Sequence, residues 1–144
     1  MQSRLQLSLF VLRISVFVVM LFWSLSKLLD PEAAAGLFES FYYIGGMSAS
    51  FINAIAVMQL AIEVAFVLGL ARFWTYGFIL ITHGVSTLAS WQQYLDPFNH
   101  MMFLAAVPML GACLALFLLR DHDTLFSLGR KEWNRTVDRQ TSVS

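Results

Sequence analysis

Four long runs of apolar residues follow one another along the chain, separated by short polar segments. The runs span approximately residues 7–28, 51–70, 73–92 and 101–119. Each run is close to the roughly 20 residues that an α-helix needs to cross the hydrocarbon core of a bilayer. Only a few residues connect the later runs, so the pattern predicts an all-α membrane protein, built as a bundle of four transmembrane helices.

The composition agrees with a membrane protein. Hydrophobic residues make up 58% of the 144 residues and charged residues only 12%, whereas soluble domains have about 25% charged residues. Residues 1–120 are therefore expected to form one transmembrane domain, and residues 121–144 a cytoplasmic tail. Apolar residues among the charges of that tail predict a short helix at the membrane surface; they are Leu125, Phe126, Leu128 and Trp133.

The basic residues gather on one side of the predicted bundle. Arg4 precedes the first run, Arg72 lies between the second and third, and the others follow the fourth: Arg120, Arg130, Lys131, Arg135 and Arg139. Lys27 alone lies on the opposite side. By the positive-inside rule, both termini are expected in the cytoplasm and the segments 29–50 and 93–100 outside.

Two opposite charges interrupt the apolar runs at similar depths. At about 1.5 Å per residue, Arg13 lies about 9 Å from the inner end of its predicted helix and Glu63 about 10 Å from the inner end of its own. A single charge at such a depth costs about 2.5–3.5 kcal/mol and is usually met by an opposite charge inside the bundle. The sequence therefore predicts that Arg13 pairs with Glu63.

Further polar residues lie near this pair. Gln59 is one helical turn from Glu63 and shares its face, and Ser24 and Lys27 share a face of the first helix with Arg13. His83 lies near the middle of the third run, about 15 Å from its inner end. We expect an intramembrane polar site formed by Arg13, Gln59, Glu63 and His83.

Two interpretations of that polar site remain open. In the first, the Arg13–Glu63 pair only fixes the register of the helices, since losing either partner would leave a buried charge alone. Alternatively it is a functional site, as intramembrane ionisable residues often are.

The outer face offers three more candidates. Lys27 closes the first helix, and Asp96 and His100 lie in the loop "LDPFNHMMF". Histidine and carboxylate side chains can bind metals, but the sequence has no H-x-x-x-H, H-E-x-x-H or C-x-x-C spacing, and His83 and His100 lie at different depths. No metal site is predicted.

Other chemistry is poorly represented in the sequence. Cys113 is the single cysteine, which excludes an internal dithiol relay. "GMSAS" at 46–50 lacks the last glycine of a nucleophile elbow, and neither a Gly-rich phosphate loop nor a covalent cofactor motif occurs. No catalytic residue is assigned, which argues against a stand-alone enzyme. The basic residues lack interleaved aromatics, so nucleic acid is not an expected partner.

Four short motifs resemble the DoxX-like family of small bacterial integral membrane proteins. They are Arg13 early in the first helix, "SKLLDP" at 26–31, Glu63 within "LAIEVAFVLGL", and "GLARFW" at 69–74. The likeness covers most of residues 5–120. It implies a four-helix protein of the bacterial inner membrane, with Arg13 and Glu63 as the family's polar pair and Lys27 as its helix-end lysine.

Members of that family look like accessory components of redox systems, including quinone-linked sulfur oxidation, maturation of periplasmic dehydrogenases and oxidative-stress assemblies. The resemblance therefore implies an accessory subunit or maturation factor of a redox system, with membrane or periplasmic redox proteins as partners and a quinone as candidate cofactor. Two alternatives stay open. One is a purely structural or assembly subunit; the other is a small transporter or metal-handling protein with Asp96 and His100 at its outer mouth.

Overall fold

The computed structural model describes residues 2–129, which contain helices and turns but no strand. The elements in chain order are α1 (Gln2–Leu29), α2 (Pro31–Tyr42), α3 (Ala49–Val67), α4 (Arg72–Ala89), α5 (Trp91–Tyr94), the 3-10 helix η1 (Met101–Ala105) and α6 (Ala106–Leu118). The prediction of an all-α protein is confirmed for this part of the chain.

Three segments within residues 2–129 are long and apolar enough to cross a membrane: Ser3–Leu29, Ala49–Val67 and Met101–Leu118. They correspond to α1, to α3, and to η1 continued by α6. Such segments are typical of an integral membrane protein. Helix α4 has 18 residues, but Arg72, His83 and several hydroxyl side chains make it less apolar than the other three.

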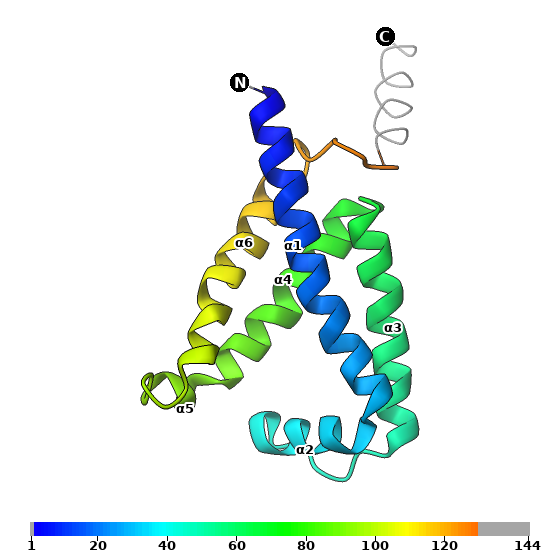
Figure 1. Cartoon of the computed structure of the whole chain (residues 1–144). Coiled ribbons are helices and arrows are strands. Elements are labelled where there is room, and N and C mark those ends of the chain that lie inside the picture. Colours follow the sequence, from blue (N-terminus) through cyan, green and yellow to red (C-terminus); the bar gives the residue numbers. More distant parts are fainter. Residues whose placement is uncertain (1, 130–144) are drawn as a thin grey trace.

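The long helices form two antiparallel pairs, α1 with α3 and α4 with α6, and the pairs meet through α1–α6 and α3–α4 contacts. One end of the bundle holds the start of α1, the turn between α3 and α4, and the end of α6 (Figure 1). We call it the terminal end. Helices α2 and α5 lie at the opposite end (Figure 1).

The predicted outer loop 29–50 contains a helix, α2, that the sequence analysis did not anticipate. Asp30 caps it by accepting a hydrogen bond from the backbone N–H of Ala33 at 2.9 Å, and Pro31 occupies its first turn. Asp-Pro therefore ends one helix and also begins the next, because proline suits the first helical turn. Helix α2 runs across the end of the bundle (Figure 1), where Phe41 contacts Phe103 of η1.

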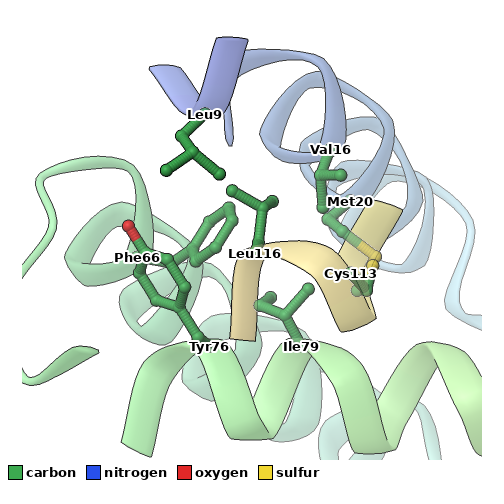
Figure 2. Close-up of a cluster of buried hydrophobic side chains, with 8 residues drawn as sticks. All are labelled: Leu9, Val16, Met20, Phe66, Tyr76, Ile79, Cys113 and Leu116. Atoms are coloured by element: carbon green, nitrogen blue, oxygen red, sulfur yellow. The ribbon is translucent and has the colours of Figure 1, made fainter. Parts of the chain in front are cut away.

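The hydrophobic core lies where α1, α3, α4 and α6 meet (Figure 2). Its buried members are Leu9, Val16, Met20, Phe66, Tyr76, Ile79, Cys113 and Leu116. Phe66 and Tyr76 pack edge to face, with ring centroids 4.8 Å apart. The thiol of Cys113 lies inside this cluster (Figure 2) and packs as a small apolar side chain.

Residues 119–129, which we call the closing segment, do not leave the bundle as a tail. The backbone N–H of Leu128 donates to the carbonyl of Leu68 at 2.9 Å, and Gln6 Nε2 donates to Thr124 Oγ1 at 2.8 Å. The folded unit therefore extends past residue 120, the predicted domain boundary. Turns, and no helix, occupy residues 119–129; the rest of the expected surface helix, with Trp133, lies outside the described residues.

A glycine makes this docking possible. Gly69 has a φ of +67°, and a Cβ atom there would lie 2.2 Å from Ser127 Oγ. Only glycine combines a positive φ with so close an approach of the closing segment.

Candidate functional site

Two buried polar clusters lie within the bundle. The first, the Arg13 cluster, consists of Arg13, Tyr76 and Asp123 at the terminal end. Arg13 Nη1 lies 3.2 Å from Asp123 Oδ2, and both side chains are 0% exposed. It is the one salt bridge among residues 2–129. Tyr76 OH donates to Asp123 Oδ2 at 2.6 Å, so the carboxylate is held by a cation and a hydroxyl.

The same arginine also holds the backbone of the closing segment. Arg13 Nη2 donates to the carbonyl of Leu125 at 2.6 Å, and Nη1 donates to Tyr76 OH at 3.4 Å. Arg13 thus ties α1 to α4 and to the chain beyond α6. A guanidinium suits this role because its planar fork of donors can serve several acceptors at once.

The predicted pairing of Arg13 with Glu63 is wrong. Ser24 of α1 contacts Glu63, and Arg13 lies eleven residues earlier in α1, a distance of about 16 Å along the helix. The depth comparison failed because it assumes that the helices end at one level: α1 extends past the turn between α3 and α4 (Figure 1), and Arg13 lies beside Gly69 of that turn. It also left out Asp123, which was assigned to the tail.

The second cluster, the Glu63 cluster, joins α1 to α3 through Ser24, Lys27, Gln59 and Glu63. Ser24 Oγ donates to Glu63 Oε1 at 2.6 Å, and Lys27 Nζ donates to Gln59 Oε1 at 2.6 Å. The spacing of three residues in α1 and four in α3 puts each pair on one helical face. Antiparallel packing then brings the two faces together.

One oxygen of this cluster has no partner. Glu63 is 0% exposed, and its Oε2 accepts no hydrogen bond from the described residues. Lys27 attracts the Glu63 carboxylate electrostatically, but no salt bridge joins the two. A buried polar atom without a partner is costly, and native proteins usually meet it with a proton, a water or a ligand. Glu63 Oε2 can therefore carry a proton or contact a polar ligand.

His83 takes part in neither cluster. Its Nε2 lies 3.1 Å from the carbonyl oxygen of Ala106. Because a carbonyl only accepts, Nε2 carries the proton in this contact. The bond links α4 to α6, whereas Gln59 and Glu63 bond to α1. The four residues expected to form one intramembrane site are therefore divided among three places.

The three outer-face candidates also separate. Lys27 is half-buried and belongs to the Glu63 cluster. Asp96 is exposed and accepts a hydrogen bond from Asn99 Nδ2 at 2.7 Å, and the exposed His100 packs edge-on against Phe103. Within residues 2–129, no group of three His, Cys, Asp or Glu side chains could hold a metal ion.

Asp123 is the site residue that the sequence analysis missed. It lies in "RDHDTLF", two residues after Asp121 and close to Arg120 and His122, which is typical of an exposed tail. The only available signal was the need of Arg13 for a counter-charge, and that signal does not distinguish Asp123 from Glu63.

The chain was compared with protein-family models, with curated proteins and with solved structures, and none of them matches it.

Proposed function

We propose that this protein is an integral membrane accessory subunit or maturation factor of a redox system, with the Glu63 cluster as its working site. One observation carries the proposal: a buried carboxylate between two apolar helices, with Oε1 held by Ser24 and Oε2 without a partner. An ionisable group in such a place is more often functional than incidental. The redox setting is supported by the resemblance of the sequence to DoxX-like proteins.

The proposal includes four membrane spans, with α4 as the fourth. Its polar side chains have partners within the bundle: Thr82 Oγ1 donates to the carbonyl of Phe78, Thr87 Oγ1 to that of His83, and His83 bonds to α6. Internal hydrogen bonds of this kind reduce the cost of placing hydroxyl and imidazole groups in lipid. These contacts support a fourth span despite its lower hydropathy.

The proposed orientation puts the terminal end in the cytoplasm of a bacterial cell. Arg4, Arg72 and Arg120 lie at this end, and cytoplasmic loops are enriched in such residues. Helix α2 and residues 91–105 then face the outside, where a periplasmic partner could contact them.

Residues of the Glu63 cluster have complementary roles in the proposed function. Ser24 fixes the carboxyl group, and the positive charge of Lys27 stabilises its ionised form. Gln59 holds Lys27 in place through the 2.6 Å hydrogen bond. Protonated at Oε2, Glu63 would donate a hydrogen bond to a carbonyl oxygen such as that of a quinone headgroup. A quinone bound there would supply the capacity to accept electrons and protons, and Glu63 would hold or pass the proton.

Native purification in mild detergent tests this proposal first. Mass spectrometry identifies the proteins that co-purify with the full chain, and an absorption spectrum shows whether they carry redox cofactors. We expect a stoichiometric dehydrogenase, oxidase or cytochrome. A colourless, partner-free protein would argue against the redox role.

The Glu63→Gln variant then tests the site. It retains an acceptor for Ser24 but cannot exchange a proton, so quinone reduction by the complex should fall roughly 100-fold while membrane insertion is kept. Asp121→Asn is the matched control, because it removes an exposed carboxylate at the terminal end, away from α2. Unchanged turnover in Glu63→Gln would reject the proton role.

A structural or assembly subunit is the second candidate. It is favoured by the Arg13 cluster, which is buried and joins α1, α4 and the closing segment through an ion pair and hydrogen bonds. If this alternative holds, a folded Ser24→Ala, Glu63→Leu double variant will still assemble with the partner at full turnover. The transporter or metal-handling alternative depends on Asp96 and His100, and metal analysis of the washed protein tests it.

A further inference from the structure

Two arginines at the terminal end contact only neutral groups among residues 2–129. Arg72 Nη1 donates to the carbonyl of Arg120 at 3.2 Å, and its Nη2 donates to Ser127 Oγ at 2.8 Å. Arg120 Nη1 donates to the carbonyl of Phe117 at 2.7 Å. Among the described residues, Asp123 is the carboxylate at this end that forms a salt bridge, and its partner is Arg13. Arg72 and Arg120 thus leave positive charge at the surface of the bundle.

The two guanidinium groups belong to one patch. Arg72 reaches the backbone of Arg120, and the Arg120 guanidinium lies over the rings of Phe73 and Phe117, at 5.4 Å and 4.8 Å from their centroids. Stacking on aromatic rings holds the Arg120 guanidinium in a fixed plane. Nη1 of Arg120 and both Nη groups of Arg72 already donate one hydrogen bond each, which leaves a second N–H on each of these atoms for a further acceptor. The patch is therefore a preformed cationic surface.

Large apolar side chains lie within two residues of Arg72, Arg120 or Ser127 in the sequence, and each is more than half exposed: Phe73, Trp74, Leu118, Phe126 and Leu128. The apolar segments Ala49–Val67 and Met101–Leu118 both end here. In a membrane, these side chains lie where the hydrocarbon gives way to the headgroups. A cationic patch within exposed apolar residues is typical of a surface that meets anionic lipid.

We propose that Arg72 and Arg120 bind the phosphate of an anionic phospholipid at the terminal end of the bundle. The remaining N–H groups of the two guanidinium groups donate to the phosphate oxygens, and Trp74, Phe126 and Leu128 contact the acyl chains of the same lipid. The apolar surroundings favour a lipid over free phosphate, which has nothing to place against them. The proposal depends on the membrane placement and not on the redox role, so either can fail alone.

Native mass spectrometry of the full chain tests this proposal. The protein is reconstituted in vesicles of equimolar phosphatidylglycerol and phosphatidylcholine, extracted in mild detergent, and the retained lipids are counted. The wild type should retain phosphatidylglycerol preferentially. Arg72→Gln with Arg120→Gln should lower that preference roughly 25-fold, about fivefold for each basic residue. Arg4→Gln removes one exposed charge at the same end and should leave the preference unchanged.

Three results would overturn the proposal. They are an undiminished preference in the folded double variant, an equal loss in Arg4→Gln, and displacement of the lipid by millimolar inorganic phosphate, which would indicate a general anion site. Loss of the Arg72 bond to Ser127 could unfold the double variant, so Arg120→Gln alone and a salt titration of the wild type accompany it. A wild-type preference that does not weaken with salt would also contradict phosphate recognition.

Discussion

Arg13 in the first helix and Asp123 beyond the last helix form a fully buried ion pair, with Nη1 and Oδ2 3.2 Å apart. The pair joins two segments that lie close to opposite ends of the described chain. Removing two charges from water is expensive, and further hydrogen bonds offset part of that cost. Tyr76 OH and the carbonyl of Leu125 supply such bonds, while Asp123 Oδ1 and Arg13 Nε have no hydrogen-bond partner among the described residues. The closing segment is therefore an integral part of the helical bundle.

Arg13→Leu and Asp123→Leu should each lower the free energy of unfolding by about 3–5 kcal/mol, because each leaves one buried charge alone. The double variant should cost clearly less than the sum of the two. Unfolding of the purified protein in detergent, followed by helical circular dichroism, measures the cycle. Additive losses would mean that the two side chains do not interact.

Tyr76→Phe removes only the hydroxyl that donates to Asp123 and accepts from Arg13. We expect a loss of about 1–3 kcal/mol in the free energy of unfolding, since a buried carboxylate loses a hydrogen bond. Tyr43→Phe is the control, because Tyr43 is mostly exposed and its hydroxyl has one long contact, at 3.5 Å from Gln92 Nε2. Equal stability of the two variants would contradict the assigned role of Tyr76.

Ser24→Ala should destabilise the protein by about 1–3 kcal/mol, because it leaves Glu63 without its remaining hydrogen-bond donor inside the bundle. Ser26→Ala lies on the same helix, where Ser26 is exposed and donates to the carbonyl of Trp23. A surface change of this kind stays within about 0.5 kcal/mol. Thermal unfolding in detergent compares the two; similar midpoints would show that Glu63 does not depend on Ser24.

Gly69→Ala tests the docking of the closing segment. The added methyl group meets Ser127 Oγ and also occupies a positive φ, so the cost should exceed the roughly 1–2 kcal/mol of the left-handed conformation alone. Gly46→Ala isolates that conformational cost, since Gly46 has a φ of +76° and open space around it.

Ser127→Gly added to Gly69→Ala should recover part of the stability, because both clashing atoms belong to the Ser127 side chain. Chemical denaturation of the single and double variants gives the comparison. If Gly69→Ala costs no more than Gly46→Ala, the closing segment does not pack against the turn between α3 and α4.

The sequence by itself determined the class of the protein. Apolar runs long enough to cross a bilayer dictate helices, because backbone groups in lipid must bond within their own segment. The same local rules identified Glu63 and Gln59 as neighbours on one face, and the structure places them so. Capping chemistry at Asp30 and Pro31 is also a local signal in the sequence for the start of α2.

Only the tertiary structure decided which residues the buried charges contact. Arg13 and Glu63 have matching depths only if all the helices begin and end at one level. Helix α1 instead extends past the turn between α3 and α4, and Arg13 lies beside Gly69 of that turn. Whether Asp123 is exposed in a tail or buried in the bundle depends on the packing of the closing segment against Gly69 and Tyr76, which are distant from it in sequence. Helical periodicity fixes which face a residue occupies, and only the packing of those faces determines which charge it meets.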